Sequence, residues 1–200
     1  MMLAFFLSAA ASAAPPDPAM LREGDIVVHK SRSTQSAALA AATHSPYTHT
    51  GLVFRRQGTW QVLEAVQPVR WTALADWVRR GRDQHIVVLR PKAPFDATKV
   101  RAAAEAYLGR SYDLLFAWSD DRIYCSELVY KAYDQAADLQ LGALVPLSTF
   151  DLEPEPVQAL IRQRVGRSLN RSEPVVAPAS LLEDEDLHWV FSNDPAHAGR

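Results

Sequence analysis

One twelve-residue stretch, residues 122–133, constrains the fold more than any other part of the sequence. It contains Cys125, the only cysteine among the 200 residues. After the cysteine, apolar side chains recur at the spacing of a helix, at Leu128, Val129, Ala132 and Tyr133. This spacing predicts an amphipathic helix that begins at the cysteine. Because the first N–H groups of a helix lack partners and the helix dipole is positive there, a thiolate at Cys125 is favoured.

A lone cysteine has a simpler interpretation. Cysteine is among the most frequently buried residues, and most buried cysteines act as small apolar side chains. Cys125 by itself therefore does not indicate an enzyme, and a catalytic interpretation needs a base elsewhere in the chain.

Length and composition indicate one domain. The 200 residues are 48% hydrophobic, which is enough for a sizeable core, and the 13 prolines are denser after Pro146. We predict a single domain over residues 20–193 and a tail over residues 194–200. The formal charge of −2, with 22% charged residues, gives no sign of nucleic-acid binding.

The N-terminus resembles a secretory signal. Residues 1–14 form an apolar run followed by small residues, and Ala11-Ser12-Ala13 fits an A-x-A cleavage site. The run lacks a positive n-region and is too short for a membrane span. We therefore expect a signal peptide over residues 1–13 and export, most simply to the periplasm. A single cysteine cannot form an internal disulfide in an oxidising compartment, which favours a chemical role for the thiol.

A predicted β-hairpin carries the second chemical feature. The runs 48–54 and 59–65 are rich in β-branched and aromatic residues, and both flank a short polar loop. Gly58 in this loop can adopt the positive φ that a hairpin turn needs.

The register of this hairpin decides whether a histidine and a glutamate meet. If Gln57 and Gly58 form a two-residue loop, Arg56 pairs with Thr59, and His49 and Glu64 point to the same face of the sheet. The carboxylate could then orient the imidazole and leave its other nitrogen free for a thiol proton. A three-residue loop would put the two side chains on opposite faces, where Glu64 would simply face solvent.

Other segments give coarser predictions. We expect strands over residues 26–29, 84–90 and 187–191, and helices over residues 33–42, 69–78, 98–108 and 157–164, with Thr72 capping the second helix. The proline-rich segment 145–178 is too long for an ordinary connection, so we expect an irregular lid over the cysteine. The remaining histidines lack metal-ligand spacing, and one cysteine cannot build a structural zinc site, so we expect neither a metal nor a cofactor.

Six short segments together resemble a known family. They are residues 24–27, 47–53, 64–65, 109–113, 124–129 and 176–180. In this order they are similar to the permuted papain-like amidases of the YiiX/YebB type, which belong to the NlpC-like cysteine hydrolases. The resemblance spans roughly residues 21 to 192. It implies an α+β, circularly permuted papain-like fold, with a small antiparallel sheet packed against the helix that starts at the catalytic cysteine.

The resemblance also implies roles for individual residues. Cys125 matches the nucleophile, His49 the base and Glu64 the group that orients the base, while Tyr112 matches a family tyrosine near the site. We expect Tyr112 and Tyr124 to contact substrate. Thr48 stands where a serine is usual before the histidine.

These roles predict a cysteine hydrolase that cleaves an amide through an acyl-enzyme. The expected substrates are a peptide, a peptidoglycan fragment such as a stem peptide, or an acyl-amide. Two alternatives remain open: a thioesterase or acyltransferase that uses the same residues on lipid-like acyl groups, and a non-catalytic binding module. In the second alternative four tryptophans would pack the core or line a groove, namely Trp60, Trp71, Trp77 and Trp118.

Overall fold

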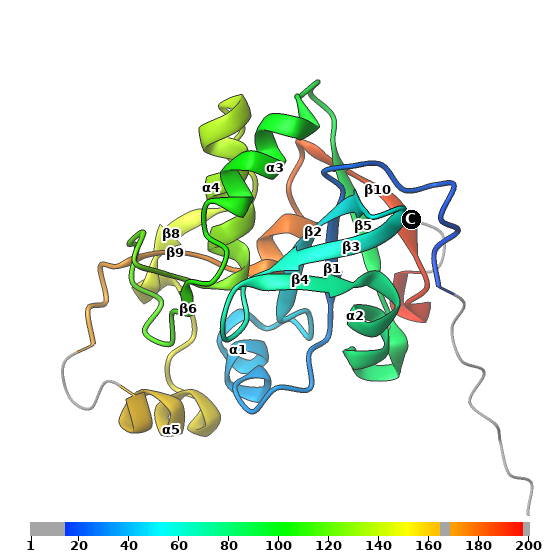
Figure 1. Cartoon of the computed structure of the whole chain (residues 1–200). Helices are drawn as coiled ribbons and strands as arrows, with labels where there is room; N and C mark the ends of the chain where they lie inside the picture. The colour runs from blue at the N-terminus through cyan, green and yellow to red at the C-terminus, as the bar shows by residue number, and fades with distance from the viewer. Residues whose placement is uncertain (1–14, 165–168, 198–200) are drawn as a thin grey trace, which may run out of the picture.

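The computed structural model describes residues 15–164 and 169–197 (Figure 1). The predicted signal peptide, residues 1–13, therefore lies outside the described residues. Within the described ranges, no helix has the length and apolar character needed to cross a membrane.

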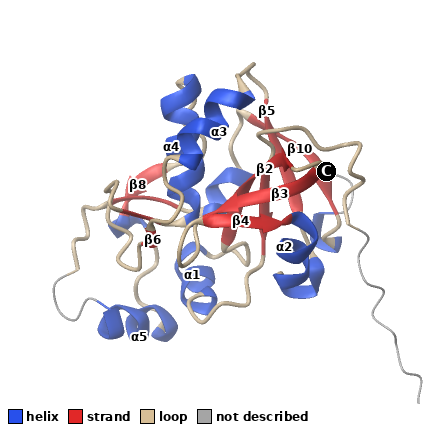
Figure 2. Ribbon diagram, in the orientation of Figure 1, coloured by secondary structure: helices blue, strands red, loops and turns tan. Residues whose placement is uncertain are grey.

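A six-stranded antiparallel sheet forms the centre of the molecule (Figure 2). Its spatial order is β10-β5-β1-β2-β3-β4. The strands are β1 (Ile26–His29), β2 (His49–Arg56), β3 (Thr59–Glu64), β4 (Arg70–Ala73), β5 (Val87–Pro91) and β10 (Leu187–Ser192). Two short pairs lie outside this sheet: β6 (Ser111–Tyr112) with β7 (Arg122–Ile123), and β8 (Leu144–Pro146) with β9 (Pro174–Val176).

Helices cover this sheet and its ends. The α-helices are α1 (Ser36–Thr43), α2 (Leu74–Arg80), α3 (Ala97–Glu105), α4 (Cys125–Ala137) and α5 (Glu155–Arg164). The described residues also contain four short 3₁₀ turns: η1 (Arg82–Gln84), η2 (Leu147–Thr149), η3 (Pro178–Leu182) and η4 (Pro195–His197). In Figure 1, α3 and α4 lie together on one side of the sheet, α2 lies beside β4, and α1 lies near α5.

The two faces of the sheet bury different side chains because successive strand residues point in opposite directions. Leu52 and Phe54 of β2 belong to the larger core, which also contains the apolar face of α4. Val53, which lies between them, packs instead in a smaller core with Trp77 of α2. The sheet is therefore covered by α3 and α4 on one face and by α2 on the other.

Helix α4 begins at Cys125, as the apolar spacing predicts. Its first turn is capped by Glu127, because the N–H of Tyr124 donates to Glu127 Oε2 at 3.2 Å. Leu128 and Val129 are fully buried against the sheet, and burial of each stabilises the fold by roughly 1.5–3 kcal/mol. This packing fixes the start of the helix, and with it Cys125, relative to β2.

Several predicted elements differ from the structure. The expected helix over residues 69–78 is wrong in its first half: residues 70–73 form strand β4, and Thr72 lies in that strand instead of capping a helix. The β-branched and aromatic pair Trp71-Thr72 pairs with β3, so sheet pairing determines the local structure here. Strand β5 begins only at Val87, because residues 82–84 form a 3₁₀ turn.

The proline-rich segment is more regular than expected. It contains β8, η2, α5 and β9, and its predicted helix is present as α5, starting two residues early. Because α5 packs on α1, the described part of the segment forms an ordered wall of the molecule.

The chain remains packed beyond residue 193. Asp194 is buried, accepts a hydrogen bond from Tyr47 and forms an ion pair with Lys30 at 2.6 Å. The segment predicted as a tail thus starts with a residue that is bonded to the body of the domain.

Candidate active site

The hairpin between β2 and β3 has the two-residue turn that brings His49 and Glu64 together. Gln57 and Gly58 have φ values of 53° and 77°, the positive φ at both positions that a tight hairpin turn requires. Arg56 pairs with Thr59, so the predicted register is confirmed. His49 Nε2 and Glu64 Oε2 are 2.6 Å apart.

Glu64 is fully buried and is held as a carboxylate by three donors. Thr72 donates to Oε1 at 2.6 Å, and Arg80 of α2 donates to Oε2 at 2.5 Å beside His49. Burial alone would raise the pKa of this carboxyl, but the hydrogen bonds from His49, Arg80 and Thr72 outweigh burial and lower the pKa to about 2. Glu64 is therefore ionised at all ordinary pH values.

His49 lies between this carboxylate and the thiol of Cys125. Burial opposes the charged imidazolium, but the hydrogen bonds and charges of Cys125 and Glu64 raise the pKa of His49 to about 9. Since Glu64 takes Nε2, the remaining ring nitrogen, Nδ1, is the one free for the thiol.

The pKa of Cys125 shifts in the opposite direction. Burial of the sulfur disfavours the thiolate, but the hydrogen bond and charge of His49 outweigh it, and the backbone groups of Thr50 and Ser126 contribute in the same direction. The net effect lowers the pKa of the thiol, so the pair favours thiolate and imidazolium. Cys125 is only 2% exposed, which keeps this ion pair in a poorly solvated environment.

The two tyrosines predicted to contact substrate line the same pocket as Cys125. The hydroxyl of Tyr112 is a hydrogen-bond partner of Cys125 and accepts from Gln35 Nε2 at 3.0 Å. Burial raises the pKa of Tyr112 well above its usual value, so the hydroxyl keeps its proton and can donate. The hydroxyl of Tyr124 accepts instead from the N–H of Val176 at 3.2 Å, which makes Tyr124 part of the wall.

A second histidine supports the first. His29 of β1 lies opposite His49 in the sheet, with ring centroids 5.3 Å apart, and its ring stacks on Trp77 at 3.9 Å. Burial, followed by the charges of His49 and Arg80, lowers the pKa of His29 well below 6.5. His29 is therefore neutral when His49 is charged.

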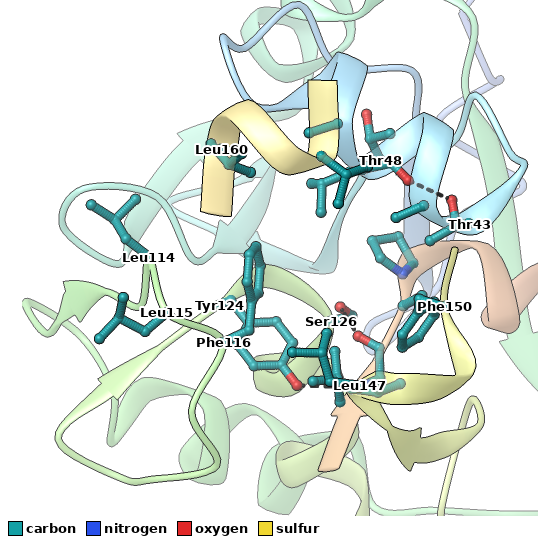
Figure 3. Close-up of a pocket in the computed structure, with 18 of the residues that line it drawn as sticks. Thr43, Thr48, Leu114, Leu115, Phe116, Tyr124, Ser126, Leu147, Phe150 and Leu160 are labelled. Atoms are coloured by element: carbon teal, nitrogen blue, oxygen red, sulfur yellow. Dashed lines mark hydrogen bonds between the residues drawn. The ribbon is translucent and has the colours of Figure 1, made fainter. Parts of the chain in front are cut away.

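Cys125 lines an apolar pocket. Figure 3 shows side chains of its wall. The cavity volume of this pocket is about 100 Å³. Apolar side chains from several separate segments line it, and Figure 3 labels Leu114, Leu115, Phe116, Leu147, Phe150 and Leu160. Part of this wall comes from η2 and α5, within the segment predicted to be a lid.

A second, more polar hollow, the polar cleft, adjoins the apolar pocket. His49 lines this cleft, whereas Cys125 lines the apolar pocket. The two hollows share four lining residues, namely Thr48, Tyr112, Leu114 and Arg164. The thiol and the imidazole thus stand where a polar and an apolar surface meet.

The tryptophans considered for a binding groove line neither hollow. Trp77 is fully buried on His29, and Trp118 packs edge-on against Tyr130. Among the residues that the structure describes, no group of three or more His, Cys, Asp or Glu side chains could hold a metal ion.

Sequence reasoning missed four residues that hold the site in place. Thr72 and Arg80 bind Glu64, Gln35 donates to Tyr112, and Gln67 Oε1 accepts from the N–H of Tyr112 at 2.6 Å. The β-branched Thr72 beside Trp71 was a usable strand signal. The other three come from separate elements and leave no spacing pattern.

The fold and the site define a class of protein. An antiparallel sheet that carries the histidine packs against a helix that begins at the cysteine, and the histidine precedes the cysteine in the chain. This is a papain-like architecture in permuted order. The chain belongs to a family of that class, because the family model described as "Permuted papain-like amidase enzyme, YaeF/YiiX, C92 family" matches residues 20–191.

Individual relatives agree with this assignment. YiiX of Escherichia coli K12, described as an uncharacterized protein, is 39% identical over 175 residues, covering 86% of this chain and 87% of YiiX. The crystal structure of metalloprotein yiiX from Escherichia coli O157:H7 is also 39% identical and matches with a TM-score of 0.82. That match covers 86% of this chain and 97% of the other. The predicted family and α+β fold are confirmed.

Proposed function

We propose that this protein is a cysteine hydrolase of amide bonds, with Cys125 as nucleophile, His49 as base and acid, and Glu64 as the residue that orients His49. The observation that supports it most is the continuous contact from Glu64 through His49 to the thiol, together with a lowered thiol pKa. A nucleophile, a base and an orienting group in this order are the requirements for acyl transfer.

The proposed reaction has two halves. The Cys125 thiolate attacks the carbonyl carbon, the C–N bond breaks, and the leaving amine takes the proton held by His49. Water then attacks the thioester, His49 accepts a proton from that water, and the acid leaves as the C–S bond breaks. His49 and Cys125 are restored to the starting ion pair, so no further reactant is needed.

Two groups are suited to stabilise the oxyanion. The N–H of Cys125 is the first of α4 and has no partner within the helix. The Tyr112 hydroxyl keeps its proton and lies beside the sulfur, so it can donate to the developing charge. We propose these two as the donors, with Tyr112 as the substrate contact predicted from the sequence and Tyr124 as part of the pocket wall.

The apolar pocket supports a substrate with an apolar acyl group. The acyl carbon must bond to the sulfur, and Cys125 lines this pocket. A peptidoglycan stem peptide is polar along its length and would leave the leucine and phenylalanine side chains in contact with polar groups. An N-acyl amide therefore fits the pocket better than a stem peptide.

The same pocket favours a second candidate, a thioesterase or acyltransferase. A thioester of an apolar acid would place the same acyl group in the pocket and form the same acyl-enzyme. The two activities differ only in the leaving group and in the acceptor that releases the acyl chain.

To test these candidates, the purified protein is incubated with four compounds: N-octanoyl-alanine, N-octanoyl-alaninamide, octanoyl-N-acetylcysteamine and a tetrapeptide amide. We expect octanoate release from an octanoyl amide and an octanoyl adduct on the peptide that contains Cys125, both measured by mass spectrometry. Cys125→Ala should abolish both. Equal turnover by Cys125→Ala, or cleavage of the tetrapeptide alone, would contradict the proposal, and cleavage of the thioester alone would favour the second candidate.

We also propose that the protein works outside the cytoplasm. The support is the apolar run and the A-x-A site near the N-terminus. A fusion of residues 1–20 to a reporter enzyme that is active only after export tests this, and retention of the fusion in the cytoplasm would contradict it.

A further inference from the structure

The polar cleft beside His49 is strongly cationic. Arg32, Arg80, Arg122 and Arg164 all line it, and no Asp or Glu is among the described residues that do so. The whole chain has a formal charge of −2. Four arginines in one cleft of a slightly acidic protein are therefore a local feature of this site.

Three of these four guanidinium groups have no anionic partner among the described residues. Arg80 is the exception, because it pairs with Glu64 at 2.5 Å. Arg164 donates only to neutral acceptors, the side chain of Gln35 at 2.8 Å and the carbonyl of Leu114 at 3.1 Å.

The side chains of Arg32 and Arg122 are exposed and form no ion pair or hydrogen bond with any other residue in the described ranges. Their charges, and that of Arg164, are open to a ligand.

The positions of Cys125 and His49 indicate which part of the substrate lies in the cleft. The acyl carbon becomes bonded to Cys125 and so lies on the side of the apolar pocket. The leaving amine must receive a proton from His49, which lines the cleft. The two hollows meet at Thr48 and Tyr112, so the scissile bond lies at that boundary and the leaving group extends among the arginines.

We propose that the substrate carries an anionic group, a carboxylate or a phosphate, on the leaving-group side of the scissile bond, and that Arg122, Arg32 and Arg164 bind it. This inference rests on the proposed function, because it uses the same scissile bond. Guanidinium groups suit the task since their planar array of N–H donors matches the oxygens of either anion. The substrate class is then an amphiphile: an apolar acyl chain joined through an amide to an amine that bears an anion.

Matched compounds test whether the site prefers a carboxylate or a phosphate. N-Octanoyl-alanine, N-octanoyl-O-phosphoethanolamine and the neutral N-octanoyl-alaninamide share one acyl chain and differ in the leaving group. We expect kcat/KM to be at least about tenfold higher for one or both anionic compounds than for the neutral one, the effect of a charge-assisted hydrogen bond. The advantage should shrink as salt is raised.

Substitutions locate the effect. Arg122→Gln and Arg32→Gln should each reduce the preference for the anionic compound, the double variant more than either, and Arg122→Lys should keep part of it because the charge remains. Arg22→Gln is the matched control: Arg22 is exposed and lines neither hollow. If Arg22→Gln lowers the preference as much as Arg122→Gln, the effect is long-range charge and the assigned site is wrong.

Binding to Cys125→Ala, measured by calorimetry, keeps the test independent of turnover. We expect the anionic compounds to bind about tenfold more tightly than the alaninamide, and this difference to fall in the Cys125→Ala, Arg122→Gln double variant. If octanoyl-alaninamide is bound as tightly and hydrolysed as fast as the two anionic compounds, the anion site is wrong and the proposed hydrolase stands. If no compound is hydrolysed but the binding preference is present, the anion site stands and the hydrolase is wrong.

Discussion

The residues on the two sides of Cys125 differ in chemical character: those on one side are polar or charged, and those on the other are mostly apolar. On the sheet side, three short hydrogen bonds join the Glu64 carboxylate to His49, Thr72 and Arg80. On the opposite side, α1, α5 and the segment that includes Phe116 line the pocket at Cys125 almost entirely with apolar carbon, and the Tyr112 hydroxyl is the polar group of that pocket that bonds to the sulfur. The first side fixes protonation states through charge, whereas the second has few polar atoms with which to do so.

In the proposed hydrolase, this difference would separate two tasks. The sheet side sets the reactivity of the thiol, since the pKa shifts of His49 and Cys125 arise from residues of the sheet and from the start of α4. The apolar side sets which acyl group fits. Substitutions on the sheet side should therefore change reactivity for every substrate, and those on the apolar side should change the choice among substrates.

The largest effect is expected from His49→Ala. Loss of the base should lower kcat/KM by about 10²–10⁴-fold on every substrate. Because the imidazolium also stabilises the thiolate, we expect alkylation of Cys125 by iodoacetamide to be fast near neutral pH in the wild type and to shift toward pH values above about 8.5 in His49→Ala. Stopped time courses of alkylation from pH 5 to 10, read by mass, measure this.

His188→Ala provides the matched control for this prediction. His188 lies exposed on β10 and lines neither hollow, so its removal should leave the alkylation profile unchanged. If His49→Ala keeps the wild-type alkylation profile, the sheet side does not activate the thiol, and the comparison between the two sides fails.

The sheet side was more predictable from sequence than the apolar side, for a physical reason. The register of one hairpin, fixed by Gln57-Gly58, was enough to place His49 beside Glu64. The start of α4 followed from its local apolar period. These are short-range rules: a turn type and a helix repeat.

The apolar side depends on contacts between distant segments. Leu114, Phe150 and Leu160 come from three parts of the chain, and nothing in their spacing shows that they share one pocket. Contacts between such segments leave no periodic pattern in one sequence. Thr72, on the sheet side, is a different case: its β-branched side chain beside Trp71 was a usable strand signal, and pairing with the neighbouring strand β3 outweighs the local helical signal.

An intermediate effect is expected from Glu64→Gln. A neutral amide cannot offset the charge of the imidazolium, so the pKa of His49 should fall below about 9 and the alkaline limb of the kcat/KM profile should move to lower pH. Loss of one hydrogen bond to a charged group should lower kcat/KM by roughly 10- to 100-fold. The measurement is a pH–rate profile from pH 5 to 10.

Glu105→Gln is the matched control, because Glu105 forms only a surface ion pair with Arg101 on α3. If the alkaline limb of the profile does not move in Glu64→Gln, Glu64 does not raise the pKa of His49.

The stability of the fold should also depend on the Glu64 carboxylate. Because the pKa of this carboxyl is lowered in the folded protein, its contribution to the free energy of unfolding is present above about pH 4.5 and is lost as pH falls toward about 2. A Tm series from pH 6 to 2 should show a smaller acid-induced loss in Glu64→Gln.

The smallest and most selective effect is expected from Leu160→Ala, which shortens one side chain of the apolar wall. Each buried methylene contributes roughly 0.8 kcal/mol, and Leu160 is only half-buried, so kcat/KM for an octanoyl amide should fall by about three- to tenfold. The matching acetyl amide does not reach this wall and should be hydrolysed at the wild-type rate, and alkylation of Cys125 should be unchanged. Leu108→Ala, at an exposed leucine outside the pocket, is the control. It should change neither kcat/KM for the two amides nor the rate of alkylation of Cys125. An equal fall on both amides, or a slower alkylation, would mean that this wall supports the reactive thiol and that the two sides of Cys125 are not independent.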